Sequence, residues 1–404
     1  MVRLLFRCYL SLLFLSAWSA WLPLPARADG TMEERLERAE EEIKELKQSL
    51  TLKTPDESES QGSKITFHGY GELHYNQPKI EGSGFPAHAL SPTLDFHRLV
   101  IGLDYAFTDR LSLHVEIDFE HAAQEIELEF AYIEYVFNDY VHLRGGSLLL
   151  PVGPLNEYHE PTHFYSVERP YVERFIIPTS WQSGGGGLAG QVIPGLRYRA
   201  YVIEGLDAAK FTSLGGIFES QAPLYEDTNT AADFGGVGRL EYTGLPGFSL
   251  GASLYSAGAA QKTPGIKTAQ VTLWDADVRY RKMGFDLSAL YAKTHIGDAS
   301  QISAAVGQTI GGRQYGWNVE GAYHVDQLTE AAWDLVPFIR FEMIDTQADV
   351  PDTLHTPGSE RQILTAGMAF FPHPDVALKG DLERWRDDTG TAAYRYNFGL
   401  AFEY

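Results

Sequence analysis

From residue 65 to the last residue, apolar and polar side chains alternate with a period of two, which is typical of β-strands with two different faces. The C-terminal segment shows the pattern most clearly, because one of its faces consists of Tyr394, Tyr396, Phe398, Leu400, Phe402 and Tyr404. There are about 16 such runs of about 10 residues, the strand length that crosses a bilayer at a tilt. The predicted strands are 65–75, 95–107, 110–120, 125–137, 141–150, 184–193, 196–204, 234–243, 248–256, 271–281, 284–294, 314–324, 334–345, 362–371, 375–385 and 393–404.

The connections between the predicted strands sort by length. The odd-numbered connections are long and include 76–94, 151–183, 205–233, 257–270 and 295–313, whereas the even-numbered ones are mostly tight, with 324–333 as the exception. Long loops on one rim and short turns on the other are typical of outer-membrane barrels, and a soluble β-sandwich has no reason to sort its loops in this way. The pattern therefore predicts an all-β fold over 65–404, a transmembrane antiparallel β-barrel in the outer membrane of a Gram-negative bacterium.

The N-terminal residues 1–28 have the features of an export signal. Arg3 and Arg7 precede an apolar stretch that is shorter than the roughly 20 residues of a spanning helix, and 26–28 offers a small-residue cleavage site. The one cysteine, Cys8, lies within this signal, so we expect a mature chain without disulfides or thiolate metal ligands.

Residues 29–53 carry a heptad pattern, with Leu36, Ile43 and Leu50 on one seven-residue repeat among charged residues. This spacing predicts a short coiled-coil helix before the barrel. The alternative is a charged, solvated helix that has no partner. Residues 54–64 are rich in Ser, Glu, Gly and Pro and are predicted to be a linker.

Composition and charge narrow the function classes. The chain has a formal net charge of −22 and a mean hydropathy of −0.21, although 13% of its residues are aromatic. A strongly acidic chain is a poor partner for nucleic acid, and a lumen that attracts anions would need its basic residues concentrated locally. We expect outer-membrane lipid as the surrounding medium. The terminal aromatic residue, Tyr404, resembles the signal of other outer-membrane proteins, and this resemblance implies the barrel-insertion machinery as a partner.

The alternation also predicts which charges face the lumen, and both signs occur there. The acidic candidates are Glu116, Asp118, Glu120, Glu127, Glu129, Asp275, Asp277, Asp381 and Glu383, and the basic ones are Arg98, Arg144, Arg197, Arg199, Arg239, Arg279, Arg340 and Lys379. Rings of one sign select ions, whereas opposed charges orient dipolar solutes, so this mixed set predicts a weakly selective channel. The simpler interpretation is that the charges only hydrate the lumen.

Catalytic motifs are missing from the sequence. It contains no phosphate loop, dinucleotide fingerprint, HExxH motif or nucleophile elbow, so we predict neither an enzyme nor a cofactor. Several histidines of the first strands could meet lumenal glutamates and bind a transition metal, namely His68, His74, His114 and His142 with Glu72 and Glu116. Solvated lumenal histidines explain the pattern better, and no metal site is assigned to them.

Several strand motifs stand out, namely 67–72 (FHGYGE), 98–102 (RLVIG), 130–135 (FAYIEY) and the stretch 145–154 before the third long loop. Together with the signal and the coiled coil, these motifs make the chain resemble the phosphate-selective porin O and P family. The resemblance implies a homotrimeric, 16-stranded channel whose third long loop, 151–183, folds inward as the pore constriction. The alternative is a surface loop outside the pore. The candidate constriction residues are Glu157, His159, Glu160, His163, Glu168, Arg169, Glu173 and Arg174.

These observations predict an outer-membrane porin, a passive diffusion channel for small hydrophilic solutes or ions. In the third loop the acids Glu157, Glu160, Glu168 and Glu173 outnumber Arg169 and Arg174, which predicts a mild preference for cations. The alternatives are a phosphate- or anion-selective channel, as the resemblance implies, and an adhesion or receptor barrel that acts through its long extracellular loops.

Overall fold

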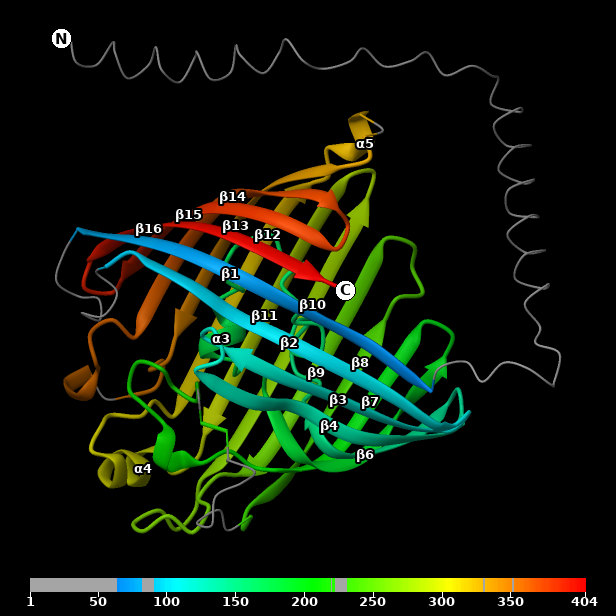
Figure 1. The fold of residues 1–404 in the computed structure, drawn as a ribbon. Helices are drawn as coiled ribbons and strands as arrows, with labels where there is room; N and C mark the ends of the chain where they lie inside the picture. Colours follow the sequence, from blue (N-terminus) through cyan, green and yellow to red (C-terminus); the bar gives the residue numbers. More distant parts are fainter. Residues whose placement is uncertain (1–63, 82–90, 219, 222–230, 330, 351) are drawn as a thin grey trace, which may run out of the picture. The chain divides into compact units, whose positions relative to one another are not determined.

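The computed structural model of the protein describes residues 64–81, 91–218, 220–221, 231–329, 331–350 and 352–404 (Figure 1). Within these residues, 16 antiparallel strands follow one another around a closed barrel, and β1 pairs with β16 to complete it. The strands are β1 (Ile65–Glu81), β2 (Thr93–Thr108), β3 (Leu111–Glu120), β4 (Glu125–Asn138), β5 (Val141–Leu149), β6 (Gln182–Ile193), β7 (Leu196–Glu204), β8 (Phe234–Tyr242), β9 (Phe248–Gly258), β10 (Gln270–Lys282), β11 (Phe285–Ile296), β12 (Arg313–Tyr323), β13 (Asp334–Asp345), β14 (Glu360–His373), β15 (Val376–Asp387) and β16 (Ala392–Glu403). The short helices are α3 (Val172–Phe175), η2 (Ala208–Lys210), α4 (Ala299–Val306), α5 (Asp326–Thr329) and η3 (Asp352–Leu354).

The predicted barrel is confirmed, with most strand boundaries within two or three residues. The main difference is β1, which continues from the predicted end at 75 to Glu81 because its ladder with β16 extends to the pair Glu81–Ala392. The even-numbered connection 324–333 is long, since it contains the helix α5. The predicted signal peptide, the coiled coil and all of the linker except its last residue lie outside the described residues.

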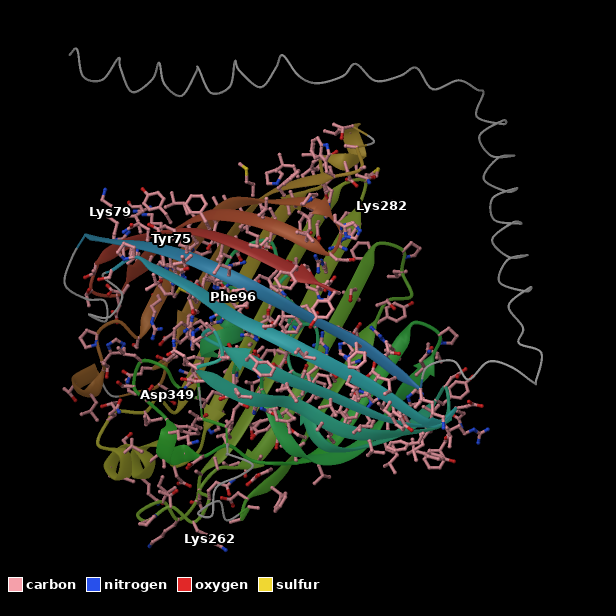
Figure 2. The ribbon with its side chains drawn as sticks, in the orientation of Figure 1. Tyr75, Lys79, Phe96, Lys262, Lys282 and Asp349 are labelled. Atoms are coloured by element: carbon pink, nitrogen blue, oxygen red, sulfur yellow. The ribbon has the colours of Figure 1, made fainter. Side chains whose placement is uncertain are left out.

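The outer face of the barrel is apolar. Phe67 is 66% exposed and Phe398 is 59% exposed, and many other outward-facing aliphatic and aromatic residues are exposed as well. Figure 2 labels Tyr75 on β1 and Phe96 on β2, which occupy outward positions of their strands. So much apolar surface on a closed barrel suits lipid, since hydrocarbon offers no partner to backbone polar groups and a closed ladder leaves none of them unpaired.

Aromatic pairs mark the rim of the barrel that carries the short turns, here called the short-turn rim. The ring centroids of Tyr105 and Phe107 are 4.9 Å apart, and those of Phe285 and Tyr323 are 5.0 Å apart. Such girdles are typical of the membrane–water interface. The opposite rim, where the long connections emerge, is called the long-loop rim. Among the described residues, no helix has the length and apolar character to cross a membrane.

The inward faces are polar near the short-turn rim but partly apolar near the long-loop rim. Inward residues such as Tyr255, Leu273 and Ala292 are fully buried there, under loop residues such as Phe211 and Ile302. The alternation alone suggested a lumen that is polar along its whole length, but the lumen is polar only in part. A part of its wall belongs to an apolar core that the long loops complete from inside.

Candidate functional site: the third loop inside the barrel

The third long loop, which runs between β5 and β6, is tied together at its base by Asn156. The side-chain amide of Asn156 donates to the carbonyl oxygens of Leu150 and Trp181, at 2.8 and 2.9 Å, and its oxygen accepts from Trp181 N at 2.7 Å. These three bonds hold the two ends of the loop side by side. Gly153 has φ +70°, and a side chain there would meet the carboxylate of Glu173, so the sharp entry turn requires glycine.

The loop then reaches the far wall of the barrel. The Tyr165 hydroxyl donates to Asp286 of β11 at 2.5 Å, and Val167 N donates to Asp381 of β15 at 2.7 Å. Tyr171 N donates to Glu342 of β13 at 2.7 Å. The loop starts beside β5 yet bonds to inward-facing side chains of β11, β13 and β15. It therefore lies inside the barrel.

The near wall holds the same loop by charged contacts. His159 Nε2 lies 2.8 Å from Glu129 of β4 and 2.8 Å from the Tyr70 hydroxyl of β1. Arg199 of β7 pairs with Glu157 at 2.7 Å. The loop is therefore bonded to both walls of the barrel.

The helix α3 anchors the loop by apolar contact. Val172 and Ile176 are fully buried in the apolar core, and Tyr171 contacts Trp385 of β15 with ring centroids 4.4 Å apart. The helix is only one turn long, so packing against the walls, and not helix propensity, keeps it folded.

The loop acids differ in their environments, and their charges cannot be counted as equal. Burial raises the pKa of Glu173 to about 8, although the N–H of Leu155 donates to it at 2.9 Å. Burial would also raise the pKa of Glu168, but the charges of Arg395 and His74 hold that pKa well below its ordinary value. At pH 7 Glu168 is therefore ionised and Glu173 is protonated.

The remaining loop candidates divide between bonded and open positions. Glu160 and His163 form an ion pair at 3.0 Å, which lowers the pKa of Glu160 against the opposing effect of burial. Burial lowers the pKa of Arg169. Arg174 lies 3.8 Å from Glu168.

Most predicted lumenal charges are buried and paired across neighbouring strands. Arg239 pairs with Asp277 at 2.7 Å and with Asp275 at 3.4 Å. The other arginine candidates meet acids as well: Arg98 meets Glu72 and Asp118, Arg144 meets Glu134, Arg197 and Arg199 both meet Glu241, Arg279 meets Asp286, and Arg340 meets Glu320 and Glu342. Lys379 instead donates to backbone oxygens of the third loop, at Pro161 and Ser166.

The acids on the early strands show where alternation holds and where it breaks. Glu116 and Asp118 are buried, as predicted for inward positions, and Glu127, which is exposed, pairs with Asp118 in the ladder and so lies on the same face. Glu129 lies at a register shift between β3 and β4, where it has no partner in the ladder, and its side chain faces inward. Several partners were missed, among them Glu134, Glu241, Asp286, Glu320, Glu342 and Arg395. All of these except Glu134, which follows the register shift in β4, continue the inward alternation of their strands, so the strand pattern could have shown that they face the lumen but not which charge each one meets.

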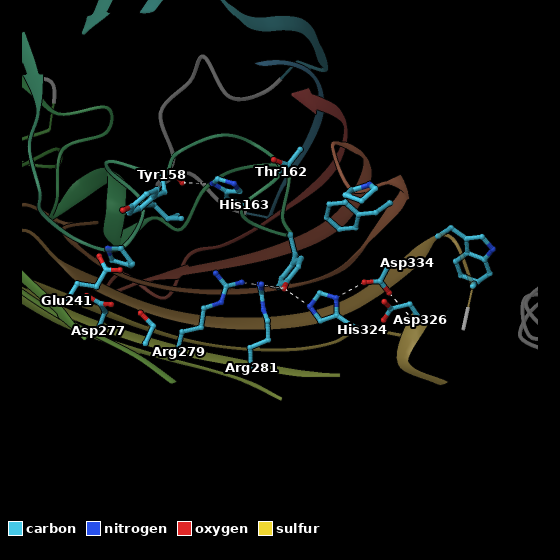
Figure 3. Close-up of a pocket in the computed structure, with 18 of the residues that line it drawn as sticks. Tyr158, Thr162, His163, Glu241, Asp277, Arg279, Arg281, His324, Asp326 and Asp334 are labelled. Atoms are coloured by element: carbon cyan, nitrogen blue, oxygen red, sulfur yellow. Dashed lines mark hydrogen bonds and ion pairs between the residues drawn. The ribbon is translucent and has the colours of Figure 1, made fainter. Parts of the chain in front are cut away.

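Two cavities lie beneath the loop, toward the short-turn rim. The larger, of about 610 Å³, is lined by charges of both signs (Figure 3). Arg279, Arg281 and His324 face it together with Asp277, Asp326 and Asp334. The smaller, of about 290 Å³, is lined by Arg144, Arg197, Arg199, Glu157 and Asp139 among others. Tyr158 of the loop borders both cavities.

The histidines considered at first for a metal site lie among lumenal carboxylates. His74 lies 2.8 Å from Glu72, and His68 lies 3.4 Å from Glu116. His114 shares Asp104 with His68, at 2.6 and 3.7 Å, and shares Glu134 with His142, at 3.9 and 3.2 Å. Among the described residues, these histidines do not form a group of three close ligand atoms.

A closed 16-stranded antiparallel barrel with a lipid-compatible outer face and a loop folded into its lumen defines the class: this is an outer-membrane β-barrel with the porin fold. No family model matches the sequence. The chain belongs to the same family as an uncharacterized protein of Aquifex aeolicus (strain VF5), with which it shares 32% identity over 356 residues, 82% of this chain and 78% of the relative.

Solved porin structures have the same fold at low sequence identity. OmpF of Salmonella typhi, in complex with daunomycin, matches with a TM-score of 0.56 and 12% identity over 84% of this chain and 97% of that chain. An anion-selective porin from Comamonas acidovorans matches with a TM-score of 0.53 and 12% identity over 84% of this chain and 99% of that chain. The trimer form of OmpT from Vibrio cholerae matches with a TM-score of 0.52 and 10% identity over 84% of this chain and 99% of that chain.

Proposed function

We propose that the protein is a passive diffusion channel of the outer membrane for small hydrophilic solutes or ions, with the third loop as its constriction. The observation that carries the proposal is the path of this loop, which crosses the lumen and bonds to both walls. The polar cavities beneath it are of a size and chemistry that suit hydrated ions and small polar solutes.

The same geometry supports weak selectivity. Most of the lumenal Arg residues that face the two cavities have carboxylate partners, so their fields largely cancel within a few ångströms. Glu173 is neutral at pH 7, which reduces the acid excess of the loop to Glu157, Glu160 and Glu168 against Arg169 and Arg174. We infer a mild cation preference, smaller than the count of loop acids alone suggested.

Reversal potentials in planar bilayers with a salt gradient test this proposal. The wild-type channel should show ionic steps and a small cation-selective potential. The variant carrying Glu157→Gln, Glu160→Gln and Glu168→Gln should shift toward anions, while Arg199 and Arg395 keep their second partners Glu241 and Glu383. Glu173→Gln is the matched control in the same loop and should not move the reversal potential at pH 7. Clear anion preference of the wild type would contradict the inferred selectivity.

A second candidate function is a receptor or adhesion barrel. It is favoured by the apolar core that the long loops build inside the lumen, because a lumen filled with packed side chains conducts poorly. A barrel that inserts into the bilayer but shows no ionic steps at any voltage would support this function and contradict the channel.

Two finer assignments belong to the channel proposal. The homotrimer is supported by the trimer form recorded for the V. cholerae protein of the same fold. Membership of the phosphate-selective porin O and P family is supported only by the strand motifs. The paired arginines give no reason to assign phosphate as the solute.

A further inference from the structure

Three potential metal ligands meet at the long-loop rim, away from the cavities beneath the third loop. Asp95 and His97 lie near the start of β2, and His121 lies in the turn between β3 and β4. Asp95 Oδ2 is 3.2 Å from His97 Nδ1 and 2.8 Å from His121 Nδ1. One ligand atom from each residue lies within 4.8 Å of the others. Two imidazole nitrogens thus converge on one carboxylate oxygen.

The position of His97 results from a bulge in β2. In the ladder with β1, Glu72 pairs with Arg98 and Leu73 pairs with Phe96, so His97 has no partner in register. A bulge redirects side chains and is enriched at functional sites. The ring of His97 stacks on that of His74, with centroids 4.8 Å apart and planes at 15°, which fixes its orientation.

The turn that carries His121 has an unusual backbone. His121, Ala122 and Ala123 have φ values of 49°, 56° and 66°, a left-handed run without glycine. The turn is fastened to β2, because His121 N donates to the His97 carbonyl at 3.0 Å and Ala122 N donates to that of Phe96 at 3.1 Å. This backbone places the imidazole of His121 against Asp95, and strain of this kind is concentrated at ligand sites.

We propose that Asp95, His97 and His121 bind one divalent transition-metal ion, of the class that includes zinc and cobalt(II). Two imidazoles and one carboxylate suit such ions. Ligand atoms around tetrahedral zinc are about 3.3 Å apart, close to the spacing from Asp95 Oδ2 to the two nitrogens. To bind a metal through Nδ1, each histidine must be neutral and carry its proton on Nε2, which leaves the Nδ1 lone pair and the Asp95 carboxylate as ligands.

The surrounding charge favours a cation. Arg98, which follows His97 in β2, lies within 4.0 Å of Glu72, Asp118 and Glu120, which together exceed its charge. A second cluster, His324 with Asp326 and Asp334, is different. Both ring nitrogens of His324 are engaged there, with Asp334 at 2.5 Å and the Tyr165 hydroxyl at 3.0 Å, so it fastens the third loop.

Metal titration of the untagged full-length barrel in detergent tests the site. Zinc binding is measured by calorimetry, and cobalt(II) binding by its visible absorption bands, whose intensity reports low-coordinate nitrogen–oxygen ligation. We expect one site in the wild type. His121→Asn and Asp95→Asn should each weaken it by at least about tenfold. Asn tolerates the left-handed turn, so His121→Asn should leave the fold intact.

His373→Ala is the matched control, because His373 also lies beside a carboxylate, 3.4 Å from Asp375, but has no second histidine with it. This variant should bind like the wild type. Unchanged affinity in both His121→Asn and Asp95→Asn would overturn the proposal, and so would loss of the site in His324→Ala alone. Because the readout is metal binding, the result does not depend on whether the barrel conducts.

Discussion

Glu173→Gln should stabilise the third loop at neutral pH and remove a pH dependence from it. Glu173 is 5% exposed, and its Oε1 accepts a hydrogen bond from Leu155 N at 2.9 Å. Burial raises the pKa of this carboxyl to about 8, with Asp277 and Asp275 adding to the effect. Glutamine keeps an oxygen for Leu155 N and never has to take up a proton.

The magnitude follows from the linkage between pKa and stability. When the loop leaves its place and Glu173 meets water, its pKa returns to about 4.5. The docked loop therefore binds more protons than the released loop between pH 4.5 and 8, and its stability falls as pH rises through this window. Keeping Glu173 buried lowers the stability of the docked wild-type loop by about 3 kcal/mol at pH 7, and by about 5 kcal/mol above pH 8. Below pH 4.5 this loss of loop stability disappears, because Glu173 is protonated in both the docked and the released loop.

The rate of hydrogen exchange in peptides of the third loop reports the stability of the docked loop, and it is compared between wild type and Glu173→Gln. Wild type and Glu173→Gln should exchange alike at pH 4.5 and diverge at pH 7 and 9, with the wild-type loop opening more often. Glu160→Gln serves as the control of opposite sign, since the pKa of Glu160 is lowered and its ion pair with His163 is lost in that variant. A difference between Glu173→Gln and wild type that is largest at pH 4.5, or equal loop protection at pH 9, would refute the reasoning.

Two other changes test the closure of the barrel and the docking of the loop. Deleting 402–404 removes Phe402, which pairs with Gly71 and Val376, and Tyr404, which exchanges backbone hydrogen bonds with Gly69. Because these contacts help to close the barrel, we expect no heat-modifiable barrel of this variant in the outer membrane. A normal yield would contradict this expectation. Arg340→Met leaves the buried Glu342 without its cation and Ser166 without its donor, and should destabilise the docked loop by about 3 to 5 kcal/mol, seen as faster exchange of loop peptides while the strands stay protected. Arg340→Lys should restore part of the protection, and wild-type exchange in Arg340→Met would count against the role of this anchor.

The strands could be predicted from the sequence because a membrane barrel imposes one simple rule on every one of them. Each outward residue meets lipid and each inward residue does not, so apolar alternation in a strand such as β16 directly reflects the geometry. The boundary of β1 was missed because its last residues, Asn76 to Glu81, do not alternate clearly, and only the ladder with β16 extends the strand to that point.

The sidedness of lumenal charges could be predicted for the same reason, but their partners could not. Alternation places Arg98 and Glu116 on the inner face and says nothing about which strand position lies opposite. It fails at bulges, where one extra residue changes the side. Glu129 and His97 both lie at such register shifts, and His97 contributes to the proposed metal site for this reason.

The third loop was the least readable segment because its side chains follow no period and take their meaning from the wall they meet. The apolar residues Val172 and Ile176 become part of a core only because inward positions such as Leu273 are themselves apolar, and no local pattern links the two. The loop acids show the same dependence in electrostatic form. Glu168 stays charged because Arg395 of β16 lies beside it, whereas Glu173, five residues later, is neutralised by burial. The ion preference of such a channel is therefore a property of contacts between the loop and the wall, and a count of charged residues in the loop overstates it.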